Sequence, residues 1–259
     1  MKKFQLEDIK QLFKKYSPPT HIASQTRSKD GVDGRIVSYL EKQSHIAEQY
    51  KVLRTNLYSL SPENPIKTVV ITSAQAREGK TITSCNLAVT LAMDKEKKIL
   101  LIDADLRKPA VHSLFGLPVE PGFSDILIGN ADLESFIKKP AVGDLFVIPA
   151  GSIKENPSEI LSLAKIENLI DRLKSKFDYI IFDTPPVLDF TDASILGSRC
   201  DAVIPVIKAG ATQQSVIEEA FHLLTEAQAK PRACILTCSH FLLDSHYYFY
   251  KYKEIPREK

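Results

Sequence analysis

Residues Val69 to Thr81 read Val-Val-Ile-Thr-Ser-Ala-Gln-Ala-Arg-Glu-Gly-Lys-Thr, and this stretch decides the fold. An apolar, β-branched run stops at a loop that closes with Gly79-Lys80-Thr81, and helix-forming sequence follows at once. A strand, loop and helix in this order predict a phosphate-binding loop, whose backbone N–H groups and helix N-terminus hold a di- or triphosphate. In this pattern Lys80 reaches the β- and γ-phosphates while the Thr81 hydroxyl binds Mg²⁺. Ala74 occupies the place of the pattern's first glycine.

The composition narrows the class of protein. The length of 259 residues is enough for one large α/β domain with an appendage. The residues are 44% hydrophobic and 25% charged, which is typical of a soluble globular protein. A formal charge of +2 gives no support for nucleic-acid binding, which normally needs a concentrated basic face. No apolar run approaches the ~20 residues that cross a bilayer, and the N-terminus lacks a signal-peptide core. We therefore expect a cytoplasmic protein.

The cysteines and histidines carry no metal-binding pattern. The four cysteines contain no C-x-x-C pair, and the six histidines show no metal-ligand spacing. We expect free thiols that behave as small buried apolar residues, and no metal site built from protein side chains alone.

The chain divides into three segments. Residues 1–35 combine a short amphipathic helix, Phe4 to Tyr16, with a mobile linker that is rich in Ser, Pro, Gly and charge. The helix could pack on its own domain, which we favour, on a neighbouring subunit or on a membrane surface. Residues 36–240 form the main domain, and residues 241–259 form a tyrosine-rich tail.

A helix is predicted over residues 41–60, where apolar residues recur at steps of three and four. Glu48, Lys51 and Arg54 crowd on a neighbouring face of this helix. This charged stripe is either a solvated surface or an intersubunit contact, and periodicity alone does not choose between them.

The rest of the main domain alternates strands with helices. After the loop, residues 82–93 are predicted to be helical, and further helices are predicted over 158–176 and 212–229. Further strands are predicted over 97–103, 145–149, 179–183, 202–207 and 233–236. Six strands in this arrangement predict an α/β fold with a doubly wound, mostly parallel sheet, whose functional residues gather at the carboxyl ends of the strands.

Three acidic residues lie at those carboxyl ends. Asp103 and Asp105 follow the second predicted strand, and Asp183 follows the fourth. Mg²⁺ prefers a few carboxylates and several waters, so these side chains are candidate ligands, although each alone could be an ordinary turn residue. The segment Thr184-Pro185-Pro186 stiffens the backbone where a switch segment would read the γ-phosphate.

The tail has an unusual composition. Four of the nine tyrosines, Tyr247, Tyr248, Tyr250 and Tyr252, lie within six residues, and the charged end of the chain follows them. They could form a strand edge or an aromatic contact with the body. On a nucleotide-binding protein, accessible tyrosines at a terminus indicate phosphate acceptors instead.

Together these motifs resemble the bacterial tyrosine kinases of the P-loop type, the cytoplasmic autokinases of capsule and exopolysaccharide synthesis. These belong to the MinD/ParA-like superfamily of P-loop NTPases. Residues Ser73 to Thr81 match their Walker A loop, Ile99 to Arg107 their A′ element, and Ile180 to Pro186 their Walker B element. Glu48 to Leu57 is similar to their oligomerisation helix, and Asn156 to Glu159 and the tail also match.

The resemblance implies a role for each matching residue. Lys80 and Thr81 would bind phosphate and Mg²⁺, Asp103 and Asp183 would lie near the metal, and Asp103 or Asp105 would accept the tyrosine proton. Arg107 would position the acceptor or the phosphates. The implied catalytic set is Lys80, Asp103, Asp105, Arg107 and Asp183, and the implied nucleotide-binding set is Ala74, Gln75, Ala76, Arg77, Glu78, Gly79, Lys80, Thr81 and Ile82.

The resemblance also implies cofactors and partners. The cofactors are ATP and Mg²⁺, and the chain would assemble into a ring through Glu48, Lys51 and Arg54, so that one subunit's tail enters the next subunit's site. A membrane-embedded polysaccharide co-polymerase would recruit the kinase to the inner face of the membrane and activate it, and a tyrosine phosphatase would reverse the reaction. No nucleic-acid partner is implied.

The chain also departs from the family's pattern. Ala76-Arg77 replaces a frequent Pro-Gly, Lys51 replaces an arginine, and Ile235-Leu236-Thr237 lacks an asparagine that reads the adenine base. Two other functions stay open: an ATP-binding scaffold of polysaccharide synthesis with little kinase activity, and a ParA/MinD-like ATPase switch. Against the switch, Gln75 stands where that group carries a second lysine.

Overall fold

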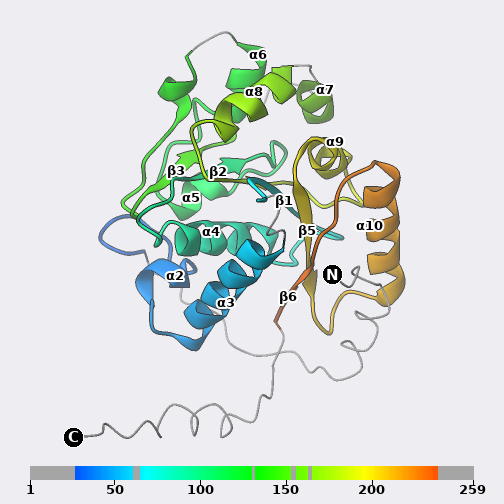
Figure 1. The fold of residues 1–259 in the computed structure, drawn as a ribbon, viewed down its shortest axis with the longest axis horizontal. Coiled ribbons are helices and arrows are strands. Elements are labelled where there is room, and N and C mark those ends of the chain that lie inside the picture. Colours follow the sequence, from blue (N-terminus) through cyan, green and yellow to red (C-terminus); the bar gives the residue numbers. More distant parts are fainter. Residues whose placement is uncertain (1–26, 61–64, 130–131, 153–155, 163–164, 239–259) are drawn as a thin grey trace, which may run out of the picture.

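Six parallel strands form one sheet in the order β3-β2-β4-β1-β5-β6, so that β1 and β4 lie at its centre (Figure 1). The computed structural model describes residues 27–60, 65–129, 132–152, 156–162 and 165–238. Each neighbouring pair of strands runs parallel, which confirms the predicted sheet. The strands are β1 (Thr68–Ser73), β2 (Ile99–Asp103), β3 (Leu145–Ile148), β4 (Tyr179–Asp183), β5 (Ala202–Lys208) and β6 (Ile235–Thr237).

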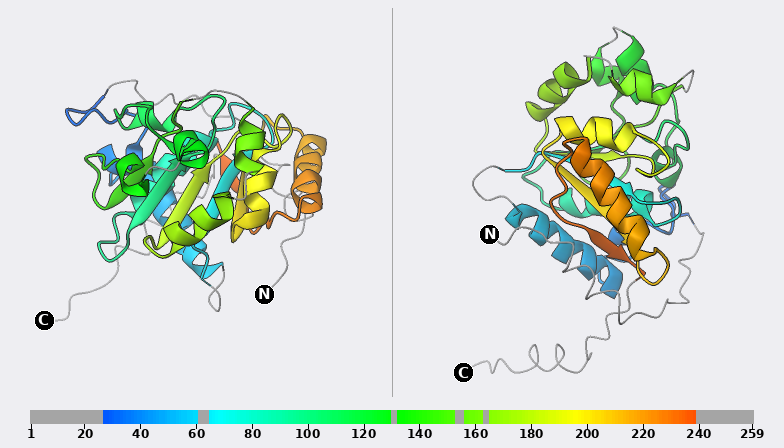
Figure 2. Two further views of the ribbon diagram at one scale, coloured as in Figure 1. Left: turned by 90° about the horizontal axis from the view of Figure 1, so that it is seen from above. Right: turned by 90° about the vertical axis from the view of Figure 1, so that its right-hand side faces the viewer.

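Helices cover both faces of the sheet, as Figure 2 shows from two further directions. Alternate residues of β1 point to opposite faces: Val69 and Ile71 join one buried cluster, while Val70 joins the other. The first face carries α2 (Val37–Leu40), α3 (His45–Ser59), α4 (Lys80–Leu91) and α5 (Val111–Leu114). The second carries α6 (Phe123–Ile128), the 3-10 helix η2 (Leu133–Phe136), α7 (Pro157–Ser162), α8 (Lys165–Lys174), α9 (Asp192–Arg199) and α10 (Gln214–Glu226).

The central strands are mostly apolar because they are covered on both sides. Every residue of β1, β2 and β4 is buried. A strand that faced water on one side would alternate polar with apolar residues instead. Burial on both faces leaves the strand ends as the places where polar side chains meet, and the phosphate loop lies at one such end, between β1 and α4.

Some predicted helix boundaries differ from the observed ones. The helix expected over 41–60 begins only at His45, because the Ser44 hydroxyl accepts a hydrogen bond from the Ala47 amide (3.2 Å) and caps the first turn. In place of one helix over 158–176, the structure has α7 and α8, with residues 163–164 between them outside the described ranges.

Part of the segment that we expected to be a mobile linker packs against the body. Val32 is fully buried in the same apolar cluster as Ile36, and the Asp33 amide donates to the Leu114 carbonyl (2.9 Å). Arg35 forms an ion pair with the Asp33 carboxylate (2.8 Å). The packed body thus begins before residue 36. The amphipathic helix predicted over 4–16 and the tyrosine tail lie outside the described residues.

The thiols differ in exposure. All four cysteines are free; Cys85 and Cys200 are buried as expected, Cys234 is half-buried, and Cys238 is exposed, contrary to expectation. Cys238 follows the edge strand β6, which no further strand of the described residues covers.

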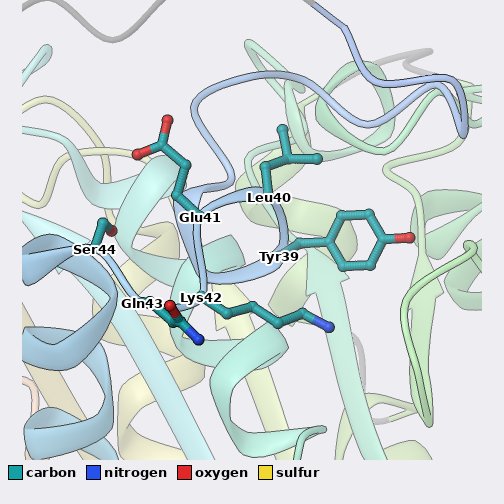
Figure 3. A pocket seen from close by; sticks show the side chains of 6 residues that line it. All are labelled: Tyr39, Leu40, Glu41, Lys42, Gln43 and Ser44. Carbon is teal, nitrogen blue, oxygen red and sulfur yellow. The ribbon is translucent and has the colours of Figure 1, made fainter.

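The surface carries a hollow away from the phosphate loop. It has a volume of about 540 Å³ and is lined by residues 39–44 at the turn between α2 and α3 (Figure 3). None of the predicted nucleotide-binding residues lines it. Within the described ranges, no helix combines the length and the apolar character that a membrane crossing needs.

Candidate active site

The phosphate loop connects β1 to α4, as the sequence predicts. Gly79 is the N-terminal cap of α4 and has a φ of +95°, a left-handed value that glycine adopts without strain. A Cβ atom at this position would lie 3.4 Å from Cγ2 of Thr237, which is an ordinary van der Waals contact, so the backbone conformation and not the available space favours glycine here. Lys80 and Thr81 are therefore the first residues of the helix, where the backbone N–H groups and the helix dipole favour a phosphate.

The loop is held in shape by Glu78. Its buried carboxylate accepts a hydrogen bond from the Gln75 amide (2.8 Å), which closes the loop on itself. The same carboxylate also accepts the hydroxyl of Thr212, from the segment between β5 and α10. The Glu78 carbonyl accepts the hydroxyl of Thr237 at the end of β6 (2.7 Å). These contacts fasten the loop to β5 and β6.

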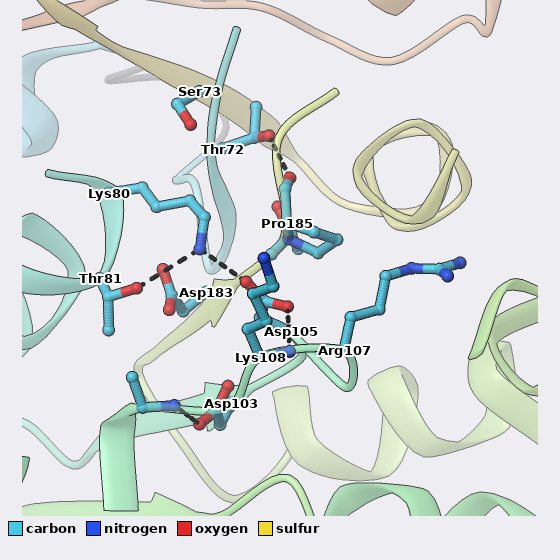
Figure 4. A network of polar contacts seen from close by, with 12 residues as sticks. Thr72, Ser73, Lys80, Thr81, Asp103, Asp105, Arg107, Lys108, Asp183 and Pro185 are labelled. Atoms are coloured by element: carbon cyan, nitrogen blue, oxygen red, sulfur yellow. Dashed lines mark hydrogen bonds and ion pairs between the residues drawn. The ribbon is translucent and has the colours of Figure 1, made fainter. Parts of the chain in front are cut away.

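Lys80 reaches the carboxylates that follow β2 and β4 (Figure 4). Its ammonium forms a buried ion pair with Asp105 (2.7 Å) and lies 3.4 Å from the Thr81 hydroxyl. Asp183 accepts a hydrogen bond from Ser84 (2.9 Å), one turn further along α4. The structure therefore brings Lys80, Thr81, Asp105 and Asp183 into one cluster.

Asp103 completes this cluster from the neighbouring strand. It lies directly beside Asp183, because β2 and β4 pair with these two residues in register. Its Oδ2 atom accepts the amides of Ala110 and Val111 (3.0 Å each), so that part of its carboxylate supports the start of α5. Both carboxylates are fully buried.

Burial sets the protonation of these groups. It raises the pKa of Asp103 well above its usual range, and the neighbouring Asp183 adds to this rise. Burial also raises the pKa of Asp183, although the Lys80 ammonium and the hydroxyls of Thr81 and Ser84 oppose it. Burial by itself would lower the pKa of Lys80, but Asp183 and Asp105 outweigh it and raise that pKa. Lys80 is thus held in its charged form by its carboxylate partners.

Two buried oxygen atoms fit a magnesium site. Asp103 Oδ1 and Asp183 Oδ2 have no hydrogen-bond partner, and buried acceptors of this kind normally meet a donor, a water or a cation. Oxygen ligands suit Mg²⁺, so Thr81, Asp103 and Asp183 are residues that would hold it, and the ion would neutralise phosphate charge. No group of three or more His, Cys, Asp or Glu side chains in the described ranges could hold a metal, so phosphates and water would supply the remaining ligands.

Arg107 points away from this cluster (Figure 4). Its guanidinium donates to the buried carboxylate of Asp192 (3.2 Å) and to the hydroxyl of Ser158 (2.8 Å). It also lies over the ring of Phe190, 4.0 Å from its centre. Arg107 joins the A′ segment to α7 and α9, and it makes no contact with Lys80 or the three aspartates.

The remaining predicted residues are placed as follows. Ala74 is buried at the start of the loop, Gln75, Ala76 and Arg77 are exposed along it, and Ile82 is half-buried on α4. Glu48 and Lys51 form an exposed ion pair (2.5 Å) on α3, whereas Arg54 turns inwards and donates to the Thr90 carbonyl of α4 (3.0 Å). The four tail tyrosines lie outside the described residues.

Sequence reasoning missed the contacts that Ser84, Thr212 and Thr237 make in the site, although it named Thr237 as part of the segment that lacks the adenine-reading asparagine. Ser84 lies four positions after Lys80, and this helical spacing could have placed it beside Asp183. Thr212 and Thr237 are distant in sequence from Glu78, and no local pattern connects them to the loop.

Comparison with known proteins agrees with this geometry. A family model described as an AAA domain matches residues 66–232. Tyrosine-protein kinase YwqD of Bacillus subtilis (strain 168) is 36% identical over 219 residues, which cover 85% of this chain and 92% of the relative. This chain belongs to the bacterial tyrosine kinases. Protein-tyrosine kinase is accordingly its class of enzyme, and the resemblance stated from the sequence is confirmed.

Solved structures support the same assignment for the kinase. The kinase domain of the Escherichia coli tyrosine kinase ETK is similar with a TM-score of 0.77 and 28% identity, over 83% of each chain. MinD of Pyrococcus horikoshii OT3, solved with Mg-ADP, is similar with a TM-score of 0.56 and 25% identity, over 66% of this chain and 69% of MinD. The kinase therefore has the P-loop NTPase fold of the MinD-like group that was expected.

Proposed function

We propose that this kinase is an ATP-dependent autokinase, which phosphorylates its own C-terminal tyrosines in trans and so regulates the polymerisation and export of capsule or exopolysaccharide. The observation that carries the proposal is the cluster of Lys80 with Asp103, Asp105 and Asp183 at the carboxyl ends of β2 and β4, beside the phosphate loop. Phosphoryl transfer depends mainly on positioning and charge neutralisation, and this cluster supplies groups for both.

The ion pair of Lys80 with Asp105 supports an order of contacts. Without nucleotide, Lys80 is paired with Asp105, so bound phosphates compete with Asp105 for its ammonium. Once Lys80 contacts the phosphates, the Asp105 carboxylate becomes available to a tyrosine hydroxyl. Asp105 or Asp103 then accepts the phenol proton, because both lie away from α4, on the side towards which the Lys80 side chain extends.

Self-association would bring an acceptor tail to this site. We propose that the exposed side of α3 contacts a second copy, since Glu48 and Val52, one helical turn apart, are both exposed there. Val52 lies on the outer side of a helix whose other side packs against α4, which supports such a contact. A membrane-embedded polysaccharide co-polymerase as recruiter and activator, and a tyrosine phosphatase as antagonist, complete the proposal.

The first prediction tests the phosphate donor site. Purified chain incubated with ATP and Mg²⁺, with the cytoplasmic segment of its partner if needed, should accumulate phosphotyrosine. Lys80→Met should abolish this signal because the β- and γ-phosphates lose their cation. Replacing Tyr247, Tyr248, Tyr250 and Tyr252 by Phe should remove most of it. Immunoblotting with an anti-phosphotyrosine antibody and mass spectrometry of the tail measure both effects.

Mixing the two variants tests transfer in trans. The Lys80→Met chain keeps its tyrosines but has no donor site, and the four-Phe chain has a donor site but no acceptors. A mixture should therefore label the Lys80→Met chain. Label on Lys80→Met incubated alone contradicts the assigned site. Hydrolysis of ATP without phosphotyrosine under every condition favours the ATP-binding scaffold or the ATPase switch.

A further inference from the structure

The active-site cluster is rich in negative charge. Within the described residues, Lys80 is the one cation that forms an ion pair with this cluster: its ammonium contacts Asp105 (2.7 Å), and the charges of Asp183 and Asp103 also act on it. The transferring phosphoryl group carries further negative charge on its three equatorial oxygens, and enzymes stabilise it with fixed cations. A second cation at the edge of the site would therefore favour the transfer.

Arg107 is not available for this purpose. Its guanidinium pairs with Asp192, whose side chain is only 1% exposed, and it also holds Ser158 and stacks on Phe190. Moving Arg107 towards the phosphates would leave the Asp192 carboxylate buried without its ion-pair partner, which is costly. Arg107 is accordingly a structural link between the A′ segment and the helices α7 and α9.

Lys108, the next residue, has the required properties. Its backbone amide donates to Asp105 Oδ1 (3.0 Å), which holds its Cα beside the Asp105 carboxylate. Pro109, the next residue, restricts the backbone conformation of Lys108. In the part of the chain that the structure describes, its exposed ammonium forms no hydrogen bond or ion pair. Figure 4 shows its side chain pointing towards Pro185, into the side of the site that Lys80 also enters, while Arg107 points the other way.

We propose that Lys108 is a further catalytic residue, which contacts the phosphoryl group during its transfer from ATP to tyrosine. The proposal rests on the proposed kinase function. In the step, the bond between the γ-phosphorus and the oxygen of ADP breaks, and that oxygen keeps the electron pair. The phosphorus forms a new bond to the tyrosine oxygen, and the phenol proton passes to the carboxylate cluster. Lys108 neutralises charge on the equatorial oxygens through this exchange, as a point charge whose backbone is held beside Asp105.

The test compares Lys108→Ala with Lys108→Arg, which keeps the charge. Removing one fixed charge from a transition state costs on the order of 100-fold in rate. We expect Lys108→Ala to lower kcat for phosphotyrosine formation by about that factor. The Kd for ATP, measured by equilibrium binding, should change little because Lys80 and the loop still hold the nucleotide. Lys108→Arg should recover part of the lost rate.

Controls separate this role from a structural one. Lys95→Ala removes an exposed lysine at the opposite end of β2 and should leave the rate unchanged. Melting temperatures report folding, and Lys108→Met, which keeps the apolar stem, repeats the test if alanine lowers stability. A wild-type rate in Lys108→Ala, or an arginine variant as slow as the alanine variant, overturns the proposal. Absence of phosphotyrosine in the wild type itself instead overturns the proposed function.

Discussion

Arg77 has a backbone conformation that is unfavourable for its side chain. Its φ is +65°, in the left-handed region where a Cβ atom crowds the following carbonyl oxygen. The kinases that this chain resembles often carry a glycine at this position, and glycine has no such cost. The sequence indicated only that a bulky cation lies on the loop, and the structure adds that the loop is strained there.

Replacing Arg77 tests this strain. Arg77→Gly should be more stable than Arg77→Ala by about 1 kcal/mol, because a left-handed L-residue costs about 1–2 kcal/mol and the extra chain entropy of glycine offsets part of that. Both variants lose the same charge, so the difference between their free energies of unfolding isolates the backbone. Urea unfolding measures it. An alanine variant at least as stable as the glycine variant would show that the loop relaxes at no cost.

Single residues of the site were predictable to different degrees. Gly79, Lys80 and Thr81 follow from a local pattern, and Asp103 and Asp183 follow from the ends of apolar runs, since these features are encoded in neighbouring residues. The orientation of Arg107 could not be predicted, because its partners Asp192 and Ser158 come from distant helices.

Among the elements, β1, β5 and α8 meet at Asp201, at the end of the sheet opposite the phosphate loop. Its carboxylate accepts the amides of Lys67 (3.0 Å) and Thr68 (2.9 Å) and the hydroxyl of Thr68 (2.9 Å), and it pairs with Lys174 (2.8 Å). Burial acts to raise the pKa of Asp201, but Lys174 and the amide donors outweigh it and lower that pKa.

The pH dependence of stability follows from this lowered pKa. A carboxylate whose pKa is lower in the folded state contributes stability above its unfolded pKa, near 4, and the contribution disappears as the pH falls through the folded pKa. Asp201→Asn should therefore destabilise the protein by about 1 kcal/mol at pH 7, and the difference from wild type should shrink below about pH 4. Thermal melts across pH measure this.

A matched variant controls for the loss of charge. Asp171→Asn removes an exposed carboxylate on α8, and its effect should be small at every pH. An equal loss of stability in Asp201→Asn at pH 7 and pH 3 would show that the charge of Asp201 contributes nothing.

At the scale of the whole molecule, the proposed assembly depends on α3. The charged residues of α3 are not equally suitable for testing that assembly by mutation. Arg54 donates to the Thr90 carbonyl of α4, so Arg54→Ala would weaken the packing of α3 as well as any contact between subunits. Glu48 is exposed, and its pair with Lys51 is a surface ion pair of little energetic value. Glu48 is therefore the better probe of assembly.

Glu48→Ala should lower the mass measured by light scattering while leaving the melting temperature of the subunit nearly unchanged. Glu41→Ala, an exposed glutamate outside α3, serves as the control and should leave the mass as it is. An unchanged mass for Glu48→Ala would remove this residue from the proposed interface.

The sequence by itself determined the parallel α/β fold, the phosphate loop and the aspartates at the strand ends. These features depend on local periodicity and on residue types that act on their nearest neighbours. Only the tertiary structure decided which side chains meet across segments. It pairs Lys80 with Asp105, fastens Glu78 to Thr212, and directs Arg107 away from the carboxylate cluster while Lys108 points towards Pro185. The physical reason is that these contacts depend on the register of the strands and on helices packed from distant parts of the chain, which no local pattern encodes.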